Sequence, residues 1–348
     1  MLFDSALSLA KDITALTSAT VALRTHPVNL DAADRYLFEP ALRKELEPSQ
    51  LLELENITTL ANGWIYQRLT LVKDSFVVTR QPSISRQLRM LPKRAFAGLS
   101  AERIDKGVWI TDNWSRNYYH WLTDAIPRLH LAKQRDPEIH LILPSYYHSI
   151  KSIKESLEPF MLKSIKIIPE NGAAVFSNFH FPTYSAESGN YNESVIRSVG
   201  KIYRDHYGSS VSAGRRIYVS RSKASVRNVV NETEIAPVLA RYGFEIVHCE
   251  NMSFSEQVHL FSESSMIAGP HGAGLVNMMF MSPGAKILEI HPRDTRINNC
   301  YFCMASAFDH PYRYMLSKTA SEALPSHLDN IIVDPKELDE QLSKMCVV

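Results

Sequence analysis

The residues best suited to catalysis lie in two separate stretches of this 348-residue sequence. In the first stretch, His120 and Asp124 are four positions apart, so on a helix they share one face and can form a hydrogen bond. A helix N-terminus disfavours the imidazolium, which makes a neutral His120 a candidate general base, with Asp124 fixing its tautomer or taking the proton itself. The alternatives are a purely structural His–Asp pair and two ligands of an incomplete metal site.

The second stretch is a glycine-rich turn, GPHGAG at 269–274, between an expected strand and an expected helix. Glycine lets the backbone approach an anion closely, and the first helical turn offers unpaired N–H groups, so Gly272, Ala273 and Gly274 are typical of a diphosphate site. The turn matches neither a P-loop nor the dinucleotide fingerprint. A turn that needs glycine only for packing is the alternative.

Charged residues flank this turn. The loop after the first strand of this second half, at 215–221, carries Arg221, Lys223 and Arg227, and arginine suits bidentate contacts with phosphate whereas lysine supplies a point charge. Such loops are often only solvated, but a position at the carboxyl end of a strand favours phosphate binding here. Glu289, near the end of the next strand, is placed to accept both hydroxyls of a ribose, and a surface carboxylate is its alternative.

The expected elements bring both stretches to the ends of strands. From Gly107 onward, strands at 107–112, 139–144 and 165–169 alternate with helices at 117–134, 150–160 and 191–207. After a Gly- and Ser-rich linker at 207–216, strands at 215–221, 244–250, 265–270 and 285–292 alternate with helices at 231–243, 253–264 and 271–284. This alternation predicts an α/β fold with parallel sheets and helices on both faces.

The linker predicts the domain organisation. We expect a first domain at 1–207, irregular over its first hundred residues and Rossmann-like after them, and a second Rossmann-like domain at 208–325. The last helix, within 326–348, is expected to pack back on the first domain. The two domains would face each other across a cleft, with the ligand beyond the carboxyl ends of the strands.

Composition excludes several classes of protein. Lys and Arg total 38 and Asp and Glu 37, so the net charge of +1 gives no reason to expect nucleic acid as a partner. No apolar stretch approaches the ~20 residues of a membrane-spanning helix, and the N-terminus lacks the basic start of a signal peptide, so we expect a cytoplasmic protein. Cys300 and Cys303 lie in an apolar helical pattern, which favours core packing over a redox or zinc site.

Several motifs together resemble a known family. The pattern N-Y-Y-H-W-L-x-D-x-x-P-R-L at 117–129 resembles the first motif of glycosyltransferase family 61. The second half is similar to the rest of that family, and the resemblance covers 107–292 in order. Its elements there are IYVSR with downstream Arg227, N-E-x-E, G-F-E-I-V, a helix with Gln257, G-P-H-G-A-G-L-x-N ending at Asn277, and the L-E-I that contains Glu289.

The resemblance implies a GT-B fold and an inverting transfer from a nucleotide sugar, often a UDP-sugar. The second domain would then bind the donor through Arg221, Lys223, Arg227, His271, Gly272, Ala273, Gly274, Asn277 and Glu289. His120 or Asp124 would deprotonate the acceptor hydroxyl, and Asn117, Tyr118 and Trp121 would lie on the acceptor side. Tyr118 and Trp121 could stack on a sugar ring or merely fill the core. Because no Asp-x-Asp occurs in the sequence, we expect no metal and no cofactor besides the donor.

The expected acceptor is a glycan or glycolipid. Plant and animal members of the family are largely secretory-pathway proteins, so the absence of an apparent anchor suggests a bacterial relative that builds capsule or another surface glycan at the cytoplasmic face of the membrane. The sugar, the linkage, a peripheral membrane contact and the oligomeric state stay open. Two other hypotheses remain: a non-catalytic binder of nucleotide sugars or glycans, and an NAD-dependent Rossmann enzyme, although its fingerprint is missing.

Overall fold

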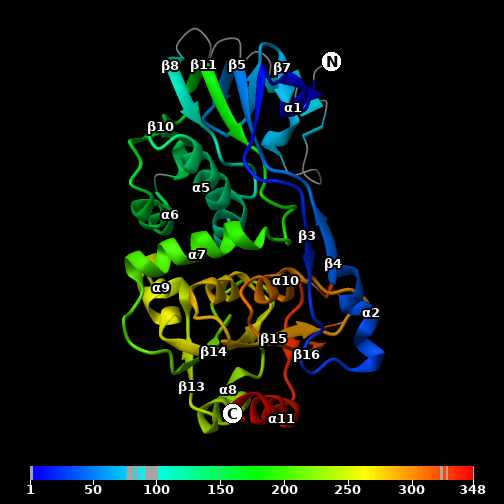
Figure 1. Cartoon of the computed structure of the whole chain (residues 1–348). Coiled ribbons are helices and arrows are strands. Elements are labelled where there is room, and N and C mark those ends of the chain that lie inside the picture. The colour runs from blue at the N-terminus through cyan, green and yellow to red at the C-terminus, as the bar shows by residue number, and fades with distance from the viewer. Residues whose placement is uncertain are drawn as a thin grey trace. The chain divides into compact units, whose positions relative to one another are not determined.

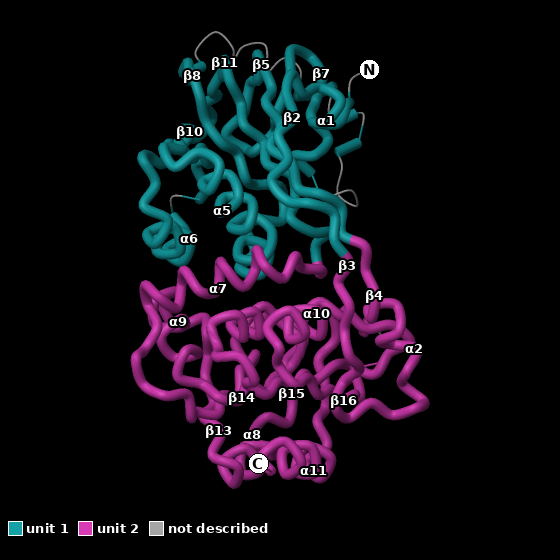
Figure 2. The backbone as a smooth tube through the Cα atoms, in the orientation of Figure 1, with its two compact units in different colours: residues 1–20, 46–188 teal, residues 21–45, 189–348 magenta. Residues whose placement is uncertain are grey.

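The computed structural model describes residues 3–76, 82–83, 85–86, 88–90, 101–147, 149–321, 324–326 and 328–347. The chain forms two compact units (Figure 2): unit 1 contains residues 1–20 and 46–188, and unit 2 contains residues 21–45 and 189–348. Within the described residues, no helix combines the length and the apolar character needed to cross a membrane.

Unit 1 is built on a nine-stranded mixed sheet (Figure 1). Its longest strands, β5 (Gln50–Leu60) and β11 (Ala173–Pro182), pair antiparallel, and β8 (Glu102–Val108) runs parallel to β11. The parallel pair β9 (His140–Pro144) and β10 (Ser164–Ile168) forms one edge. The remaining strands, on the side of β5, are β1 (Phe3–Asp4), β2 (Asp12–Ala15), β6 (Ile65–Gln67) and β7 (Thr70–Val72).

The main helix of unit 1 connects β8 to β9. It begins as α4 (Tyr118–His120), continues as the π-helical segment η5 (Trp121–Ala125) and ends as α5 (Ile126–Arg135), which packs against β11. Asn117 caps its start, because the side-chain oxygen accepts a hydrogen bond from the N–H of Tyr119 at 2.9 Å. The shorter helices are α1 (Ala6–Leu9), α6 (Lys151–Leu157) and the 3₁₀ turns η3 (Lys73–Ser75), η6 (Ser145–Tyr147) and η7 (Glu158–Phe160).

Unit 2 contains a six-stranded sheet in the order β13-β12-β14-β15-β16-β17. The strands are β12 (Arg215–Val219), β13 (Phe244–Val247), β14 (Ser264–Pro270), β15 (Lys286–Pro292), β16 (Tyr312–Thr319) and β17 (Ile331–Ile332), all parallel except β17. The chain order reverses between β12 and β14, and ligands of open α/β sheets bind at such a switch point, beyond the carboxyl ends of the strands.

Helices cover both faces of this sheet (Figure 1). On one face, α8 (Glu232–Arg241) and α11 (Pro335–Cys346) pack together. On the other face lie α7 (Glu193–Tyr207), α9 (Phe254–Ser262), the 3₁₀ helix η9 (Ala273–Phe280) and α10 (Cys300–Ala307). A short turn, η8 (Cys249–Asn251), follows β13. The fold is therefore mixed α/β with parallel strands, which is compatible with a Rossmann-like glycosyltransferase.

Two helices lie in a different unit from the one that the sequence predicted. Helix α7 was expected in the first domain, but it packs on α9 and η9 of unit 2, so the boundary falls at residue 188 and the 207–216 linker lies inside unit 2. A Cβ on Gly200 would come within 2.6 Å of the Met279 carbonyl, so glycine permits this close packing. Helix α11, expected to return to the first domain, instead buries Leu338, Leu342 and Met345 in the core of unit 2.

An early segment also belongs to unit 2. Residues 21–45 run through β3 (Thr20–Leu23), η1 (Ala32–Asp34), α2 (Arg35–Phe38), η2 (Glu39–Ala41) and β4 (Arg43–Leu46). Phe38 is fully buried, with its ring centroid 4.8 Å from that of Tyr314 on β16. The Tyr314 hydroxyl donates to Asp34 at 2.7 Å. These contacts attach the segment to the β16 side of the unit 2 sheet.

Most of the other expected elements are confirmed. The helix over 117–134 and the alternating strands and helices from 215 to 292 are present, and Ser253 caps α9 with a full capping box, whereas the helix expected at 271–284 is a 3₁₀ helix. Cys300 and Cys303 are buried free thiols, as core packing predicts. Unit 1 differs from an all-parallel Rossmann sheet because β5 is antiparallel to β11.

Candidate active site

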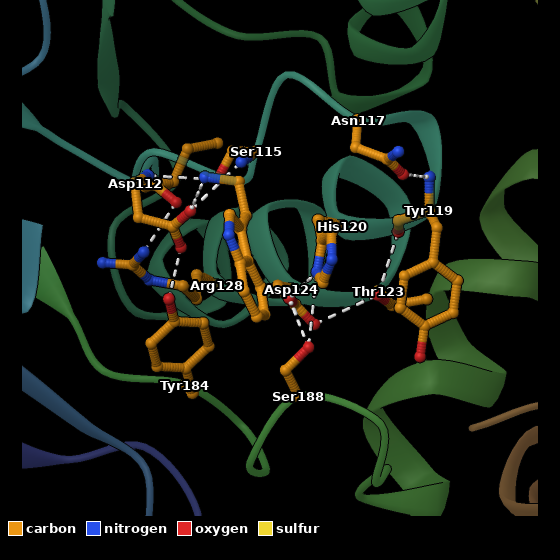
Figure 3. Close-up of polar contacts among 12 residues, drawn as sticks. Asp112, Ser115, Asn117, Tyr119, His120, Thr123, Asp124, Arg128, Tyr184 and Ser188 are labelled. Atoms are coloured by element: carbon orange, nitrogen blue, oxygen red, sulfur yellow. Dashed lines mark hydrogen bonds and ion pairs between the residues drawn. The ribbon is translucent and has the colours of Figure 1, made fainter. Parts of the chain in front are cut away.

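His120 and Asp124 form a hydrogen-bonded pair, and Ser188 is bonded to the same carboxylate (Figure 3). His120 Nδ1 lies 2.7 Å from Asp124 Oδ2, and the Ser188 hydroxyl donates to the same oxygen at 2.9 Å. The Thr123 hydroxyl lies 3.0 Å from Asp124 Oδ1. Asp124 is buried, whereas the His120 side chain is 20% exposed. With Nδ1 donating to the carboxylate, a neutral His120 presents the lone pair of Nε2, which is the arrangement of a general base.

The helix and its neighbours hold the imidazole in place. Asp124 lies in the π-helical turn, a rare conformation that is frequent at functional sites. The His120 ring is 4.7 Å from the Trp114 ring and 5.1 Å from the Tyr119 ring, with an edge-on arrangement for Tyr119. Rings on two sides and a carboxylate on Nδ1 restrict the imidazole to one orientation.

A buried arginine fixes the loop that precedes this helix (Figure 3). Arg128 is fully buried and donates to the carbonyls of Pro182 at 2.6 Å and Ile110 at 2.7 Å. Asp112, at the start of the loop, accepts hydrogen bonds from the N–H groups of Trp114 and Ser115 and from the Tyr184 hydroxyl. Burial holds the pKa of Arg128 below its ordinary value, although the charges of Tyr184 and Asp112 oppose this shift.

The three residues predicted for the acceptor side have different surroundings. Asn117 is exposed but uses its side-chain oxygen as the helix cap. Tyr118 is half-buried. Trp121 is only 1% exposed and donates from its indole nitrogen to Ser156 at 2.7 Å, so it fills the core rather than offering a face to a sugar. The core alternative therefore holds for Trp121.

In unit 2, the glycine turn and the basic loop meet at the switch point between β12 and β14. A Cβ on Gly272 would lie 2.1 Å from Nη1 of Arg221, so only glycine leaves room for this guanidinium. Arg221 donates to the Val226 carbonyl at 2.9 Å, and Arg227 has a left-handed backbone with φ of 60°. In the part of the chain that the structure describes, the buried Nε atoms of Arg221 and Arg227 have no hydrogen-bond partner.

Among the described residues, neither of these two arginines forms an ion pair with a carboxylate. Burial and then the repulsion of Arg227 lower the pKa of Arg221, and these causes outweigh the opposing charges of Tyr301 and Glu250. Buried donors without partners are costly unless a ligand satisfies them. Both side chains are only half-buried, so an anion beside the two guanidiniums would pair with them and relieve the repulsion, which suits a phosphate.

The other residues predicted for the donor lie at different depths. Ala273 and Gly274 begin η9, while Lys223 is exposed and its ammonium donates to Asn251 at 2.9 Å. Asn277 is fully buried and donates to Gln257 at 2.8 Å, so it supports the glycine turn from beneath and has no exposed atom for a donor. This burial contradicts direct donor contact by Asn277 in the described structure.

Glu289 is also buried, in a cluster with two histidines. Its Oε1 lies 2.5 Å from Nδ1 of His271, and its Oε2 accepts from the Tyr312 hydroxyl at 2.7 Å and lies 3.2 Å from Nε2 of His291. The side chain is 0% exposed, so no oxygen remains accessible for the ribose hydroxyls that the sequence analysis assigned to it. Glu289 instead orients His271, which is the half-buried member of the cluster that adjoins the glycine turn.

The same cluster is the group of described residues that could hold a metal. The ligand atoms of His271, Glu289 and His291 all lie within 4.8 Å of one another, and two imidazoles with one carboxylate are a ligand set that zinc accepts. However, the carboxylate already pairs with both imidazoles and with a tyrosine hydroxyl, so its hydrogen-bonding capacity is satisfied without an ion. The residues therefore fit a hydrogen-bonded cluster at least as well as a metal site.

Replacing Glu289 with glutamine tests this cluster. Burial raises the pKa of Glu289, but the charges and hydrogen bonds of His291 and His271 lower it further, so its net pKa lies below the ordinary value of 4.5. The carboxylate thus stabilises the fold above about pH 4.5, and this contribution is lost as the pH falls. Since an amide would put N–H donors against other donors, we expect Glu289→Gln to destabilise unit 2 by ~2–4 kcal/mol in urea unfolding at pH 7.

The matched control is Glu245→Gln. Glu245 forms an exposed ion pair with Arg215 at 2.5 Å in the same sheet, where loss of the charge is expected to cost less than ~1 kcal/mol. Equal losses in the two variants would contradict the structural role of Glu289.

Sequence reasoning missed several members of these sites. Ser188 follows a strand that the sequence analysis did not predict, and nothing in its local pattern links it to His120. Tyr312 reaches Glu289 from the neighbouring strand β16, whereas His291 lies on β15, two residues after Glu289. The spacing of Glu289 and His291 was the available signal, because residues two apart on a strand share a face.

Comparison with known proteins gives one family match and several partial relatives. Residues 118–288 match the family model described as Glycosyltransferase 61. Among curated relatives, protein O-linked-mannose beta-1,4-N-acetylglucosaminyltransferase 2 of Takifugu rubripes is 35% identical over 75 residues, which cover 20% of this chain and 12% of that protein. The human protein of the same name is 32% identical over 96 residues, which cover 26% of this chain and 16% of that protein.

A second kind of relative has a similar name. The EGF domain-specific O-linked N-acetylglucosamine transferase of Drosophila melanogaster is 33% identical over 90 residues, which cover 25% of this chain and 17% of that protein. The matched stretches thus span less than a fifth of each of these relatives. The family match, by contrast, includes both the His120–Asp124 pair and the Arg221–Gly272 turn. Residues 118–288, just under half of the chain, are thus similar to glycosyltransferase family 61, and the relatives with matching stretches are named as N-acetylglucosamine transferases.

Proposed function

We propose that the protein is an inverting glycosyltransferase that moves a sugar from a nucleotide sugar to a hydroxyl group of a glycan or glycolipid. The observation that carries this proposal is the pair of half-buried arginines, Arg221 and Arg227, which lie at the switch point of unit 2 and have no ion-pair partner in the described part of the chain. Such donors suit a diphosphate, and the base that the reaction also needs is available in the His120–Asp124 pair. In the proposed GT-B arrangement, the two units would face each other across a cleft.

On the donor side, Arg221 and Arg227 would bind the diphosphate of the nucleotide sugar. Their charges would stabilise the nucleoside diphosphate as it leaves, which is the task that a metal performs in other enzymes of this class. His271, held by Glu289, would adjoin the phosphate or the transferred sugar. The absence of Asp-x-Asp from the sequence supports transfer without a metal.

On the acceptor side, His120 would act as the base. Its Nε2 would accept the proton of the acceptor hydroxyl while the oxygen attacks the anomeric carbon from the face opposite the leaving group. The new glycosidic C–O bond forms as the bond from the anomeric carbon to the phosphate oxygen breaks, and the configuration inverts. Asp124, which accepts from His120 Nδ1, would stabilise the imidazolium that results.

The names of the relatives indicate the donor to test first. They contain N-acetylglucosamine, so we propose UDP-N-acetylglucosamine, with other UDP-sugars next. The proposed biological setting is the synthesis of a capsule or another surface polysaccharide, in the cytoplasm or at the inner face of the cytoplasmic membrane. Neither Asn277 nor Trp121 is assigned a substrate contact, because both are buried.

Thermal unfolding with nucleotides tests the proposal. At ~100 times its dissociation constant, a nucleoside diphosphate adds ~2.7 kcal/mol of stability, which moves the melting temperature by several degrees. We expect a shift with UDP or UDP-N-acetylglucosamine that persists in EDTA and does not grow with manganese. A shift with NAD alone, or no shift with any nucleotide, would contradict the transferase proposal. A nucleotide shift without any sugar transfer would favour a non-catalytic binder.

A further inference from the structure

A cavity of about 460 Å³ in unit 1 opens beside the loop that leads to the His120 helix. Thr111, Asp112, Asn113 and Arg116 of this loop form one wall. The remaining lining residues come from three other segments and are Asn62, Gly63, Trp64, Ser75, Phe76, Pro82, Arg86 and Tyr146. A volume of this size is within the range of small-molecule sites.

The wall combines aromatic rings with polar groups. Trp64 and Phe76 meet edge to face at 5.3 Å, and Tyr146 lies on the same cavity. Aromatic surfaces with a few amide and hydroxyl groups suit a ligand that has both apolar C–H faces and hydroxyls, as a sugar ring does.

The charged residues that line the cavity leave an excess of positive charge, because two arginines face one aspartate. Asp112 is 5% exposed, and its carboxylate is occupied by two backbone N–H groups and the Tyr184 hydroxyl. Arg116 is exposed, with its guanidinium 4.8 Å from the centre of the Tyr146 ring, and Arg86 is 5.7 Å from the Trp64 ring. In the described part of the chain, neither arginine forms an ion pair with a carboxylate. An arginine on an aromatic face keeps its N–H groups available for a carboxylate or phosphate.

The same loop connects the cavity to the proposed base. Asp112 accepts from the N–H of Trp114 at 2.6 Å, and the Trp114 ring lies 4.7 Å from the His120 ring. A ligand bound by Arg116 would therefore contact the same loop that packs against His120, the proposed base.

We propose that this cavity binds an acidic sugar of the acceptor, with the carboxylate or phosphate of that sugar paired with Arg116 and the sugar ring against Tyr146. Its role as an acceptor subsite rests on the proposed transferase function, whereas the binding of an acidic sugar does not.

Ligand-observed NMR without any donor tests the binding. The probes are methyl β-glucuronide, glucose 6-phosphate, neutral methyl β-glucoside and inorganic phosphate, each with the wild type, Arg116→Ala, Arg116→Lys and Arg103→Ala. Arg103 is an exposed arginine of β8 that does not line the cavity, so it controls for the loss of charge. We expect an acidic sugar to bind more tightly than the glucoside. Arg116→Ala should weaken its binding about 10- to 100-fold, Arg116→Lys less, and Arg103→Ala hardly at all.

The outcomes are separable. The tighter of the glucuronide and the sugar phosphate identifies the acidic group, and binding of inorganic phosphate as tight as that of glucose 6-phosphate would mean that the sugar ring contributes nothing, against the proposal. Equal affinities for acidic and neutral sugars, or an acidic preference that survives in Arg116→Ala, would also overturn it. If acidic sugars bind through Arg116 but no UDP-sugar is ever consumed, the transferase proposal fails while the cavity assignment stands.

Discussion

His120→Ala is expected to lower the turnover of sugar transfer by ~10²–10⁴-fold while the dissociation constant of the nucleoside diphosphate stays unchanged. The reason is that His120 supplies the Nε2 lone pair that accepts the acceptor proton, whereas the nucleotide is expected to bind in unit 2. Asp124→Asn should lower turnover in the same range, because an amide cannot stabilise the imidazolium. Ser188→Ala removes one hydrogen bond to Asp124 and should cost less. Steady-state kinetics and calorimetric titration with UDP measure the two quantities separately.

A second histidine of unit 1 provides the control. His140 is half-buried and its Nδ1 lies 2.7 Å from Ser164 Oγ, so His140→Ala removes a similar side chain and hydrogen bond at another place. Its turnover should stay near that of the wild type. If His120→Ala and Asp124→Asn both retained full turnover, the base would have to be sought among other residues.

The second large effect is expected on donor binding. Arg221→Ala and Arg227→Ala should each weaken the binding of UDP by about 10- to 100-fold, because each removes a charge-assisted hydrogen bond to the diphosphate. Gly272→Ala should act in the same direction, since its Cβ would displace the Arg221 guanidinium from a position 2.1 Å away. Titration calorimetry of UDP with each variant measures these changes.

Lys223→Ala is the control for charge in the same loop. Lys223 is exposed and its ammonium already pairs with Asn251, so its removal should weaken UDP binding only slightly. A similar loss for Lys223→Ala and Arg221→Ala would indicate a general electrostatic effect. Unchanged affinity in both arginine variants would mean that the nucleotide binds elsewhere.

The sheet of unit 2 was largely predictable from the sequence because its signals are local. Short apolar runs followed by helical patterns define β12 to β15 and the helices between them, and parallel strands need such crossovers. The Arg221 loop and the Gly272 turn were expected to meet because both follow carboxyl ends in one sheet, and the 2.1 Å that would separate a Cβ on Gly272 from Arg221 shows that they do.

The remaining features depend on partners that are distant in the sequence. Strand β11 is defined by its antiparallel pairing with β5, whose residues precede it by more than a hundred positions. His271 and Tyr312 set the direction of Glu289, and Gln257 sets that of Asn277. The sequence shows none of these contacts, so both residues were predicted to be exposed ligand contacts. Helix α7 follows unit 1 in sequence but packs by its apolar face in unit 2, and the Gly- and Ser-rich segment after it resembles a hinge only in composition.

The course of the chain through residues 21–45 affects how the protein can fold during synthesis. This segment leaves the ribosome early, yet Asp34 bonds to Tyr314, 280 positions later. The apolar surface of Phe38 therefore stays exposed until the chain has been made as far as Tyr314. Contacts of such high sequence separation slow folding and favour aggregation of the incomplete chain. Unit 2 should consequently be the last to become stable and the part most dependent on chaperones, and it cannot be obtained intact by cutting the chain at residue 188.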